Sequence, residues 1–178
     1  MELYYIVCST FIMFGSLLWV LVKDCKLNLF NLTCLSVSVF LGVYINIAGS
    51  QFLLPYFVIQ SINDVKEQKV YYLPNILAII LSVPYAFGSV STILYGAILI
   101  VLLYFSKYGN GDKKCIFALY LVFQFYEVFD GIFYLLLSVF LANLIFIVYG
   151  IIKKKDRHVR RAFFPSLFIG YGIVLLLI

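Results

Sequence analysis

The sequence is poor in charged residues. Only 12% of its 178 residues are Asp, Glu, Lys or Arg, whereas 65% are hydrophobic. A soluble domain of this size has too much surface to cover with so few polar side chains. The mean hydropathy of +1.08 agrees with that exclusion. The composition therefore predicts an integral membrane protein whose main partner is the lipid bilayer.

The sequence also lacks the residues that metal and nucleophile sites need. His158 is its only histidine, and its cysteines (Cys8, Cys25, Cys34 and Cys115) form no Cys-x-x-Cys pair. A zinc site needs clustered ligands of these types, and a serine or cysteine nucleophile needs a nearby base. We therefore expect no metal and no cofactor. A reactive thiol at Cys25, beside basic residues, is the less favoured alternative.

The positive charges are concentrated in four short segments. All 13 Lys and Arg residues lie in them: Lys23 and Lys26; Lys66 and Lys69; Lys107, Lys113 and Lys114; and Lys153 to Lys155 with Arg157, Arg160 and Arg161. Because basic loops stay on the cytoplasmic side of a membrane, we place all four segments there. Topology thus explains the net charge of +5, and we expect no nucleic-acid partner.

The uncharged stretches between these segments define the expected crossings. The stretch from Leu27 to Asn63 is too long for one helix across a hydrocarbon core of about 30 Å, and both its flanks are cytoplasmic. It must therefore cross outward and return, with an outer turn near Asn46, Gly49, Ser50 and Gln51.

The same reasoning predicts two further hairpins. Their outer turns are expected near Pro84 to Ser91 and near Glu127, Asp130 and Gly131. Single crossings precede and follow the hairpins: Leu3 to Val22, which we interpret as a retained helix, and Ala162 to Ile178.

The sequence therefore predicts a single all-α domain over residues 1–178. It is expected to be a polytopic membrane helix bundle with about eight crossings and both termini outside. Several of its helices should be short, with about 16 to 18 residues each.

The most specific motif is Gly109-Asn110-Gly111-Asp112, where a cytoplasmic loop enters a new helix. Two glycines allow a tight turn and a close approach to a substrate. Asp112 then lies near the first turn of that helix. The alternative is that Asp112 only caps the helix.

Asp64 is the expected partner of Asp112. It ends the third crossing and so lies at the same, cytoplasmic, membrane level. Acids at the edge of the hydrocarbon are costly and are functional candidates. Two carboxylates at one level can share a proton, so that one activates water and the other hydrogen-bonds a scissile carbonyl. This predicts peptide hydrolysis at the cytoplasmic face.

These motifs resemble those of type IV prepilin peptidases. Gly109 to Asp112 followed by Lys114 is similar to the family's Gly-x-Gly-Asp-x-Lys. Asp64 followed by Val70 resembles its first aspartate motif, with the usual Pro-Asn three residues late at Pro74-Asn75.

The chain resembles the short form of that family. Its first cytoplasmic loop is only Lys23 to Lys26, so the segment linked to methylation is missing and no methyltransferase activity is expected. The segment 163–171 is similar to the family's Pro-containing last helix.

The resemblance implies an aspartyl endopeptidase of the bacterial plasma membrane. It would cleave the leader of prepilins or pseudopilins, in type IV pilus assembly or protein secretion. Glu67 and Asp156 could contact a leader lysine, although each can equally be an ordinary loop charge. The implied site consists of catalytic Asp64 and Asp112, with Gly109, Gly111 and Lys114 as substrate-binding or supporting residues.

Two alternatives remain open. A presenilin-like intramembrane protease also uses Gly-x-Gly-Asp and a second aspartate, and Pro165-Ser166-Leu167 partly matches its Pro-Ala-Leu. A non-enzymatic transport or assembly subunit should instead have polar residues at mid-membrane. We interpret Tyr71, Tyr72 and Tyr108 as interfacial belt residues, and 153–161 as a headgroup anchor.

Overall fold

The protein is all α-helical in the residues that the structure describes, which are 3–24, 26–45, 47, 49–86, 90–126, 128–152 and 163–178. The computed structural model contains no strand within these ranges, so the all-α prediction is confirmed. The eight helices in them are α1 (Leu3–Lys23), α2 (Leu29–Ile45), α3 (Ser50–Glu67), α4 (Tyr72–Ala86), α5 (Val90–Phe105), α6 (Asn110–Phe123), α7 (Val128–Ile152) and α8 (Phe164–Leu177).

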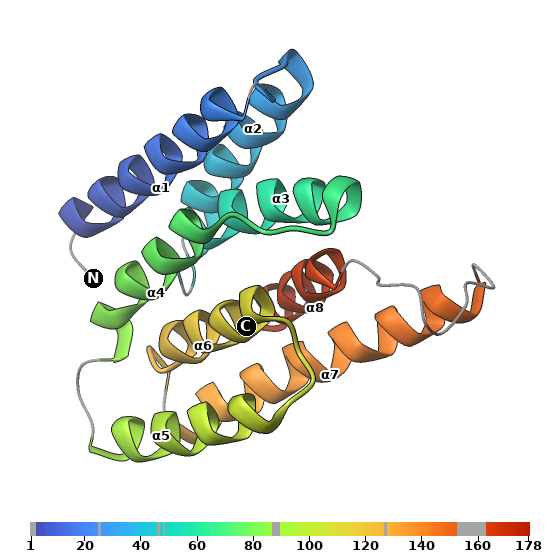
Figure 1. Ribbon diagram of the computed structural model, residues 1–178. Helices are drawn as coiled ribbons and strands as arrows, with labels where there is room; N and C mark the ends of the chain where they lie inside the picture. Colours follow the sequence, from blue (N-terminus) through green and yellow to red (C-terminus); the bar gives the residue numbers. More distant parts are fainter. Residues whose placement is uncertain are drawn as a thin grey trace.

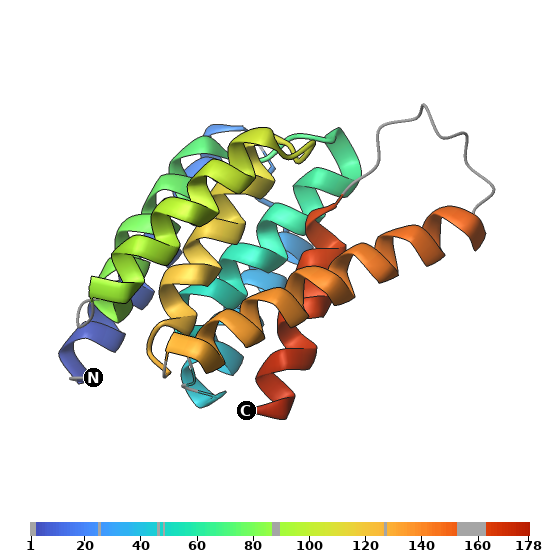
Figure 2. The ribbon, with the colours of Figure 1, turned by 90° about the horizontal axis from the view of Figure 1, so that it is seen from below.

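Consecutive helices alternate in direction and form an antiparallel bundle (Figure 1). The α1–α2, α3–α4 and α5–α6 loops therefore lie at one end of the bundle, whereas both chain ends lie at the other (Figure 2). We name the first the basic end, because its loops carry Lys26, Lys69 and Lys107. The Lys26 Nζ donates a hydrogen bond of 2.8 Å to Asn63 Oδ1, which ties the first loop to α3.

The bundle is organised around α3, which packs against α1, α2, α4 and α8. The ring of Phe57 stacks on that of Tyr171 with centroids 5.2 Å apart, and the ring of Tyr56 meets Phe164 edge-on at 5.9 Å. Aromatic pairs of this kind contribute about 0.5–1.5 kcal/mol each beyond the area they bury. This cluster fixes the start of α8 against α3.

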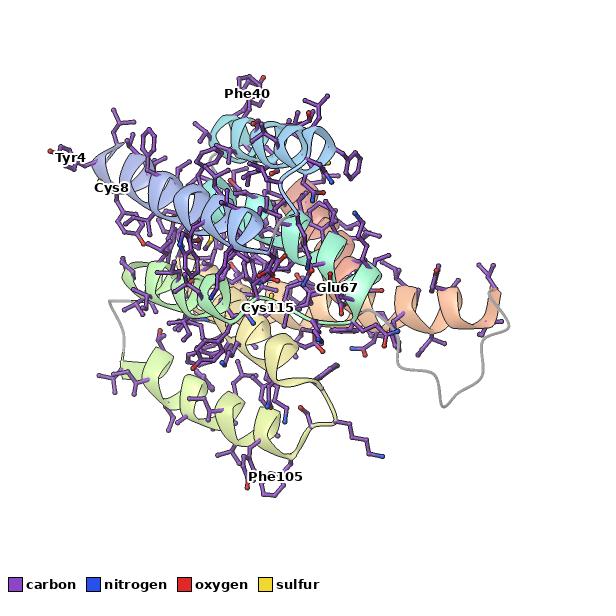
Figure 3. The ribbon with its side chains drawn as sticks, turned by 45° about the horizontal axis from the view of Figure 1, so that its top comes forward. Tyr4, Cys8, Phe40, Glu67, Phe105 and Cys115 are labelled. Atoms are coloured by element: carbon purple, nitrogen blue, oxygen red, sulfur yellow. The ribbon has the colours of Figure 1, made fainter. Side chains whose placement is uncertain are left out.

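The outer surface of the bundle is apolar. Phe40 on α2 is 71% exposed and Phe105 on α5 is 79% exposed. Figure 3 shows both side chains projecting outward. Extended apolar surface marks contact with lipid or with another protein. Two helices, over Leu3–Lys23 and Asp130–Ile152, are long and apolar enough to cross a membrane.

The helices range from 14 residues in α6 and α8 to 25 residues in α7. With 17, 18 and 16 residues, α2, α3 and α5 have the short length that was expected of several helices. The first outer turn is placed as expected, since α2 ends at Ile45 and Gly49 has a left-handed φ of 70° before α3.

The second expected turn is also placed as predicted, because α4 ends at Ala86 and α5 begins at Val90, between Pro84 and Ser91. The third is displaced, since α6 ends at Phe123 and α7 begins at Val128, so that Asp130 and Gly131 lie in the first turn of α7. A Cβ at Gly131 would lie 2.4 Å from the Phe123 carbonyl oxygen, so this glycine serves close helix packing and not a turn. The prediction that Asp130 and Gly131 form part of a turn was therefore wrong.

Several residues weighed from the sequence lie outside the described residues. They are Cys25, Asn46, Gly88, Glu127 and the segment 153–162, which contains Asp156 and His158.

Candidate functional site

Asp64 and Asp112 line one cavity at the basic end. The cavity has a volume of about 310 Å³. We name it the aspartate cavity. Asp64 comes from the last turn of α3 and Asp112 from the first turn of α6. The remaining lining residues are Gln68, Lys69, Val70, Gly109, Asn110, Gly111 and Phe163. The structure thus brings together the two aspartates that the sequence selected.

Asp64 is held at the start of α8. Its side chain is buried, and its Oδ2 accepts a hydrogen bond of 3.1 Å from the Phe164 N–H. This N–H is the first amide of α8, one of the donors that a helix leaves unsatisfied at its N-terminus. The positive end of the helix dipole favours a negative charge there. Asp64 therefore links α3 to α8 while it faces the cavity.

Asp112, like Asp64, accepts a hydrogen bond from a backbone N–H at the start of a helix. Its Oδ2 accepts a hydrogen bond of 3.2 Å from the Gly109 N–H, so that it caps a free backbone amide at the start of α6. The two interpretations of Asp112 are therefore compatible, because this half-buried carboxylate caps its helix and also lines the cavity. Both carboxylates lie beside a helix N-terminus.

The chain turns between the end of α5 at Phe105 and the start of α6 at Asn110 without a left-handed backbone at either glycine of the motif. Among the described residues, only Gly49 and Gln68 have positive φ, and Gly109 has an extended backbone with φ −63° and ψ 155°. Gly111 is needed for a different reason. A Cβ there would lie 2.1 Å from Val70 Cγ2, so the missing side chain lets α6 meet the α3–α4 loop. The close approach that the structure shows at Gly111 is to Val70, and the expected approach to a substrate remains a prediction.

A buried network of polar side chains on α3 and α4 fixes the α3–α4 loop. The Gln60 side chain donates to the Tyr71 carbonyl at 3.0 Å and accepts from the Tyr71 N–H at 2.8 Å. Asn75 Oδ1 accepts from Gln60 Nε2 at 3.2 Å and from the Tyr56 hydroxyl at 2.6 Å. Buried polar groups that are fully paired fix one arrangement. The network therefore sets the position of Val70 beside Gly111.

Sequence reasoning missed Gln60 and Asn75 as supporting residues. One available signal was spacing, since Tyr56, Gln60 and Asp64 are four residues apart and share a face of α3. The other signal was Pro74-Asn75, which follows Asp64 three residues later than in the family motif. In the structure the side-chain nitrogen of Asn75 lies 3.5 Å from the position that a Cβ on Gly111 would take.

Lys114 is placed differently from the expectation. Its Nζ lies 4.0 Å from the centre of the Tyr72 ring, in a cation–π contact, and it is not among the described residues that line the aspartate cavity. Lys69 is the basic residue that lines the cavity. Lys114 therefore joins α6 to α4 instead of facing the carboxylates.

Glu67 is engaged by Lys26 in this structure. The Lys26 Nζ lies 2.6 Å from Glu67 Oε1. Partial burial lowers the pKa of Lys26, but its hydrogen bonds to Glu67 and Tyr71 outweigh that effect and leave the pKa raised. A leader lysine would have to compete with Lys26 for Glu67.

A second groove opens from the aspartate cavity towards α7. It has a volume of about 680 Å³ and we name it the α7 groove. It shares Gly109, Asp112 and Phe163 with the aspartate cavity. Its further lining residues are Lys107, Tyr108, Asn143 and Phe146. The two spaces therefore meet at Asp112.

Within the part of the chain that the structure describes, no group of three or more His, Cys, Asp or Glu residues could hold a metal ion. Cys8, Cys34 and Cys115 are free thiols, and Cys115 is buried one turn after Asp112 (Figure 3).

The fold and the cavity together define an α-helical bundle with two carboxylates at one end. No protein-family model, no curated protein and no solved structure matches this chain. The resemblance to prepilin peptidases therefore rests on the two aspartate motifs.

Proposed function

We propose that this chain is an integral membrane aspartyl endopeptidase of the prepilin peptidase type, with Asp64 and Asp112 as its catalytic pair. One observation carries the proposal. Two carboxylates from different helices, each beside a helix N-terminus, line one cavity of about 310 Å³. Such a cavity can admit a water molecule and a peptide bond between the two acids.

The proposed chemistry needs no metal and no covalent intermediate. One carboxylate, in its ionised form, takes a proton from water, and the resulting hydroxide attacks the scissile carbonyl carbon. The other carboxyl, protonated, donates a hydrogen bond to the carbonyl oxygen. The proton taken from water then passes to the leaving amine as the C–N bond breaks. The close contact between Gly111 and Val70 holds the two aspartate motifs side by side.

We also propose that all eight helices cross the bacterial plasma membrane, with the basic end in the cytoplasm. The apolar exposed surface and the lysines of the basic end support this topology. The substrates would be prepilins or pseudopilins, cut where a polar leader meets a hydrophobic helix. The aspartate cavity suits that position, since it lies at the level of the basic loops.

The test is cleavage of co-expressed candidate prepilins by the wild type, Asp64→Asn and Asp112→Asn. Each substitution removes the charge and keeps the shape, so we expect cleavage to fall by at least about a thousandfold. Asp130→Asn is the matched control, because Asp130 lies in the first turn of α7 at the opposite end of the bundle and is exposed. It should cleave like the wild type.

Folding of each variant is checked by thermal unfolding in detergent. Cleavage that persists in a folded Asp64→Asn or Asp112→Asn protein would show that the pair is not catalytic. A wild type that cleaves none of the candidates would overturn the proposed activity.

A presenilin-like protease is the second candidate. Pro165-Ser166-Leu167, the partial match to its motif, lies in the first turn of α8 directly after the amide that binds Asp64. The same assay separates the two, because a presenilin-like enzyme cuts within the hydrophobic segment and a leader peptidase cuts before it. Mass spectrometry of the products locates the cut.

A further inference from the structure

The α7 groove has two kinds of wall. Its aromatic wall consists of Phe163 between Tyr108 and Phe146, with ring centroids 5.2 Å and 5.6 Å apart. Its polar side chains, besides Asp112, include Lys107 and Asn143. The side-chain nitrogen of Asn143 donates to the Tyr108 hydroxyl at 2.7 Å and to the Val139 carbonyl at 2.8 Å. The side-chain oxygen of Asn143 can therefore accept a further hydrogen bond.

We propose that this groove binds the apolar segment of the substrate next to the scissile bond, with Phe146 of α7 as a specificity-determining residue and Asn143 as a residue that binds the substrate backbone. The inference rests on the proposed function and deepens it. Phe146 contacts an apolar substrate side chain, and Asn143 accepts a hydrogen bond from a substrate backbone N–H.

Because the aspartate cavity and the α7 groove share lining residues, the groove would hold the part of the substrate next to the scissile bond. A peptide bond placed between Asp64 and Asp112 must continue on both sides, and the α7 groove begins at Asp112 itself. The chain on that side meets the rings of Phe146 and Phe163. Burying apolar side chains against aromatic rings is favourable, whereas a charged leader there would lose its hydration.

The part of the aspartate cavity that the α7 groove does not share has a more polar lining. It includes Gln68 and Lys69 of the α3–α4 loop and Asn110 of α6, together with the apolar Val70. The polar part of a substrate is therefore favoured on the α3–α4 loop side, and the apolar part on the α7 side. The exposed apolar residue Ile147, next to Phe146 on α7, agrees with this direction.

The C-terminal part of α7 extends beyond the other helices (Figures 1 and 2). Asn143 and Phe146 precede the end of this helix, so the groove is bordered by a helix that is not enclosed on all sides. A hydrophobic substrate helix can then approach from the side, with its backbone hydrogen bonds intact until it reaches the site.

The first test is a specificity profile of Phe146→Ala in the full-length enzyme in detergent. The probe is the prepilin that the wild type cleaves, with Phe, Leu or Ala at the first position on the apolar side of the cut. We expect kcat/KM to fall about tenfold for Phe and Leu, and to stay near the wild-type value for Ala, as is typical for loss of a hydrophobic subsite. Phe140→Ala is the matched control, since Phe140 is an exposed residue of the same helix.

A photocrosslink provides the second test and does not depend on the stability of Phe146→Ala. A photoreactive phenylalanine analogue replaces Phe146 in the inactive Asp112→Asn protein. It should attach to the apolar side of the uncleaved substrate, and the same analogue at position 140 should not.

The outcomes separate the two proposals. If the wild type cleaves but Phe146→Ala and Phe140→Ala have the same profile, or the crosslink maps to the leader, the inference fails and the proposed function stands. If the wild type cleaves none of the candidate prepilins, the proposed function fails and the inference with it.

Discussion

At the residue scale, Gly111 is the point where the two halves of the site meet. Its Cα faces Val70 of the α3–α4 loop so closely that a Cβ would lie 2.1 Å from Val70 Cγ2. Val70 is itself held by the hydrogen bonds between Gln60 and Tyr71. A side chain at position 111 must therefore displace either α6 or the loop, and with it one aspartate relative to the other.

We expect Gly111→Ala to lower cleavage more strongly than it lowers stability. Overpacking of a well-packed contact costs about 1–3 kcal/mol. A displacement of about 1 Å at the dyad can reduce the rate about a hundredfold. Gly172→Ala is the control, since no atom lies within 4 Å of a Cβ there. Cleavage and thermal unfolding are measured in parallel, and an active Gly111→Ala enzyme would show that this contact does not set the dyad.

The two aspartates could be selected from the sequence because an acid at the membrane edge is unusual in itself. Gln60 and Asn75 could not, because their role depends on which loop closes over them. An isolated polar residue in an apolar helix gives no information about its partner. The same holds for Lys114, whose contact with Tyr72 arises only when α4 and α6 pack together.

At the scale of the elements, glycines set how closely neighbouring helices pack. A Cβ at Gly170 of α8 would lie 2.4 Å from the Ser138 carbonyl oxygen of α7, and one at Gly42 of α2 would lie 2.5 Å from the Ser50 carbonyl oxygen of α3. Small residues allow helix backbones to approach in this way in membranes. The sequence predicted the number of helices from their charge pattern, but it could not show which glycines pack and which turn.

We expect Gly170→Val to separate α8 from α7 and to destabilise the protein by about 1–3 kcal/mol. Because the first amide of α8 binds Asp64, the same change should also lower cleavage. Thermal unfolding in detergent measures the first effect and the prepilin assay the second.

Gly172→Val on the same helix controls for the helix propensity of valine, because a Cβ at Gly172 meets no atom within 4 Å. Equal melting temperatures for the two variants would contradict the assigned role of Gly170.

At the scale of the whole molecule, the bundle has two chemically different ends. The loops that carry Lys26, Lys69 and Lys107 meet at one end together with Asp64 and Asp112. The opposite end holds the turn between α6 and α7, where Phe125 is 54% exposed. Basic loops favour the cytoplasm, so this asymmetry predicts one orientation in the membrane.

Cysteine labelling in intact cells tests that orientation. In a chain whose four native cysteines are replaced by serine or alanine, Phe125→Cys should react with a membrane-impermeant maleimide from outside. Lys107→Cys should react only after the cells are permeabilised. Both positions are exposed at loops, so a difference between them reports the side of the membrane and not burial. The reverse pattern would place the aspartate cavity outside the cytoplasm, where a leader that has not yet been exported could not reach it.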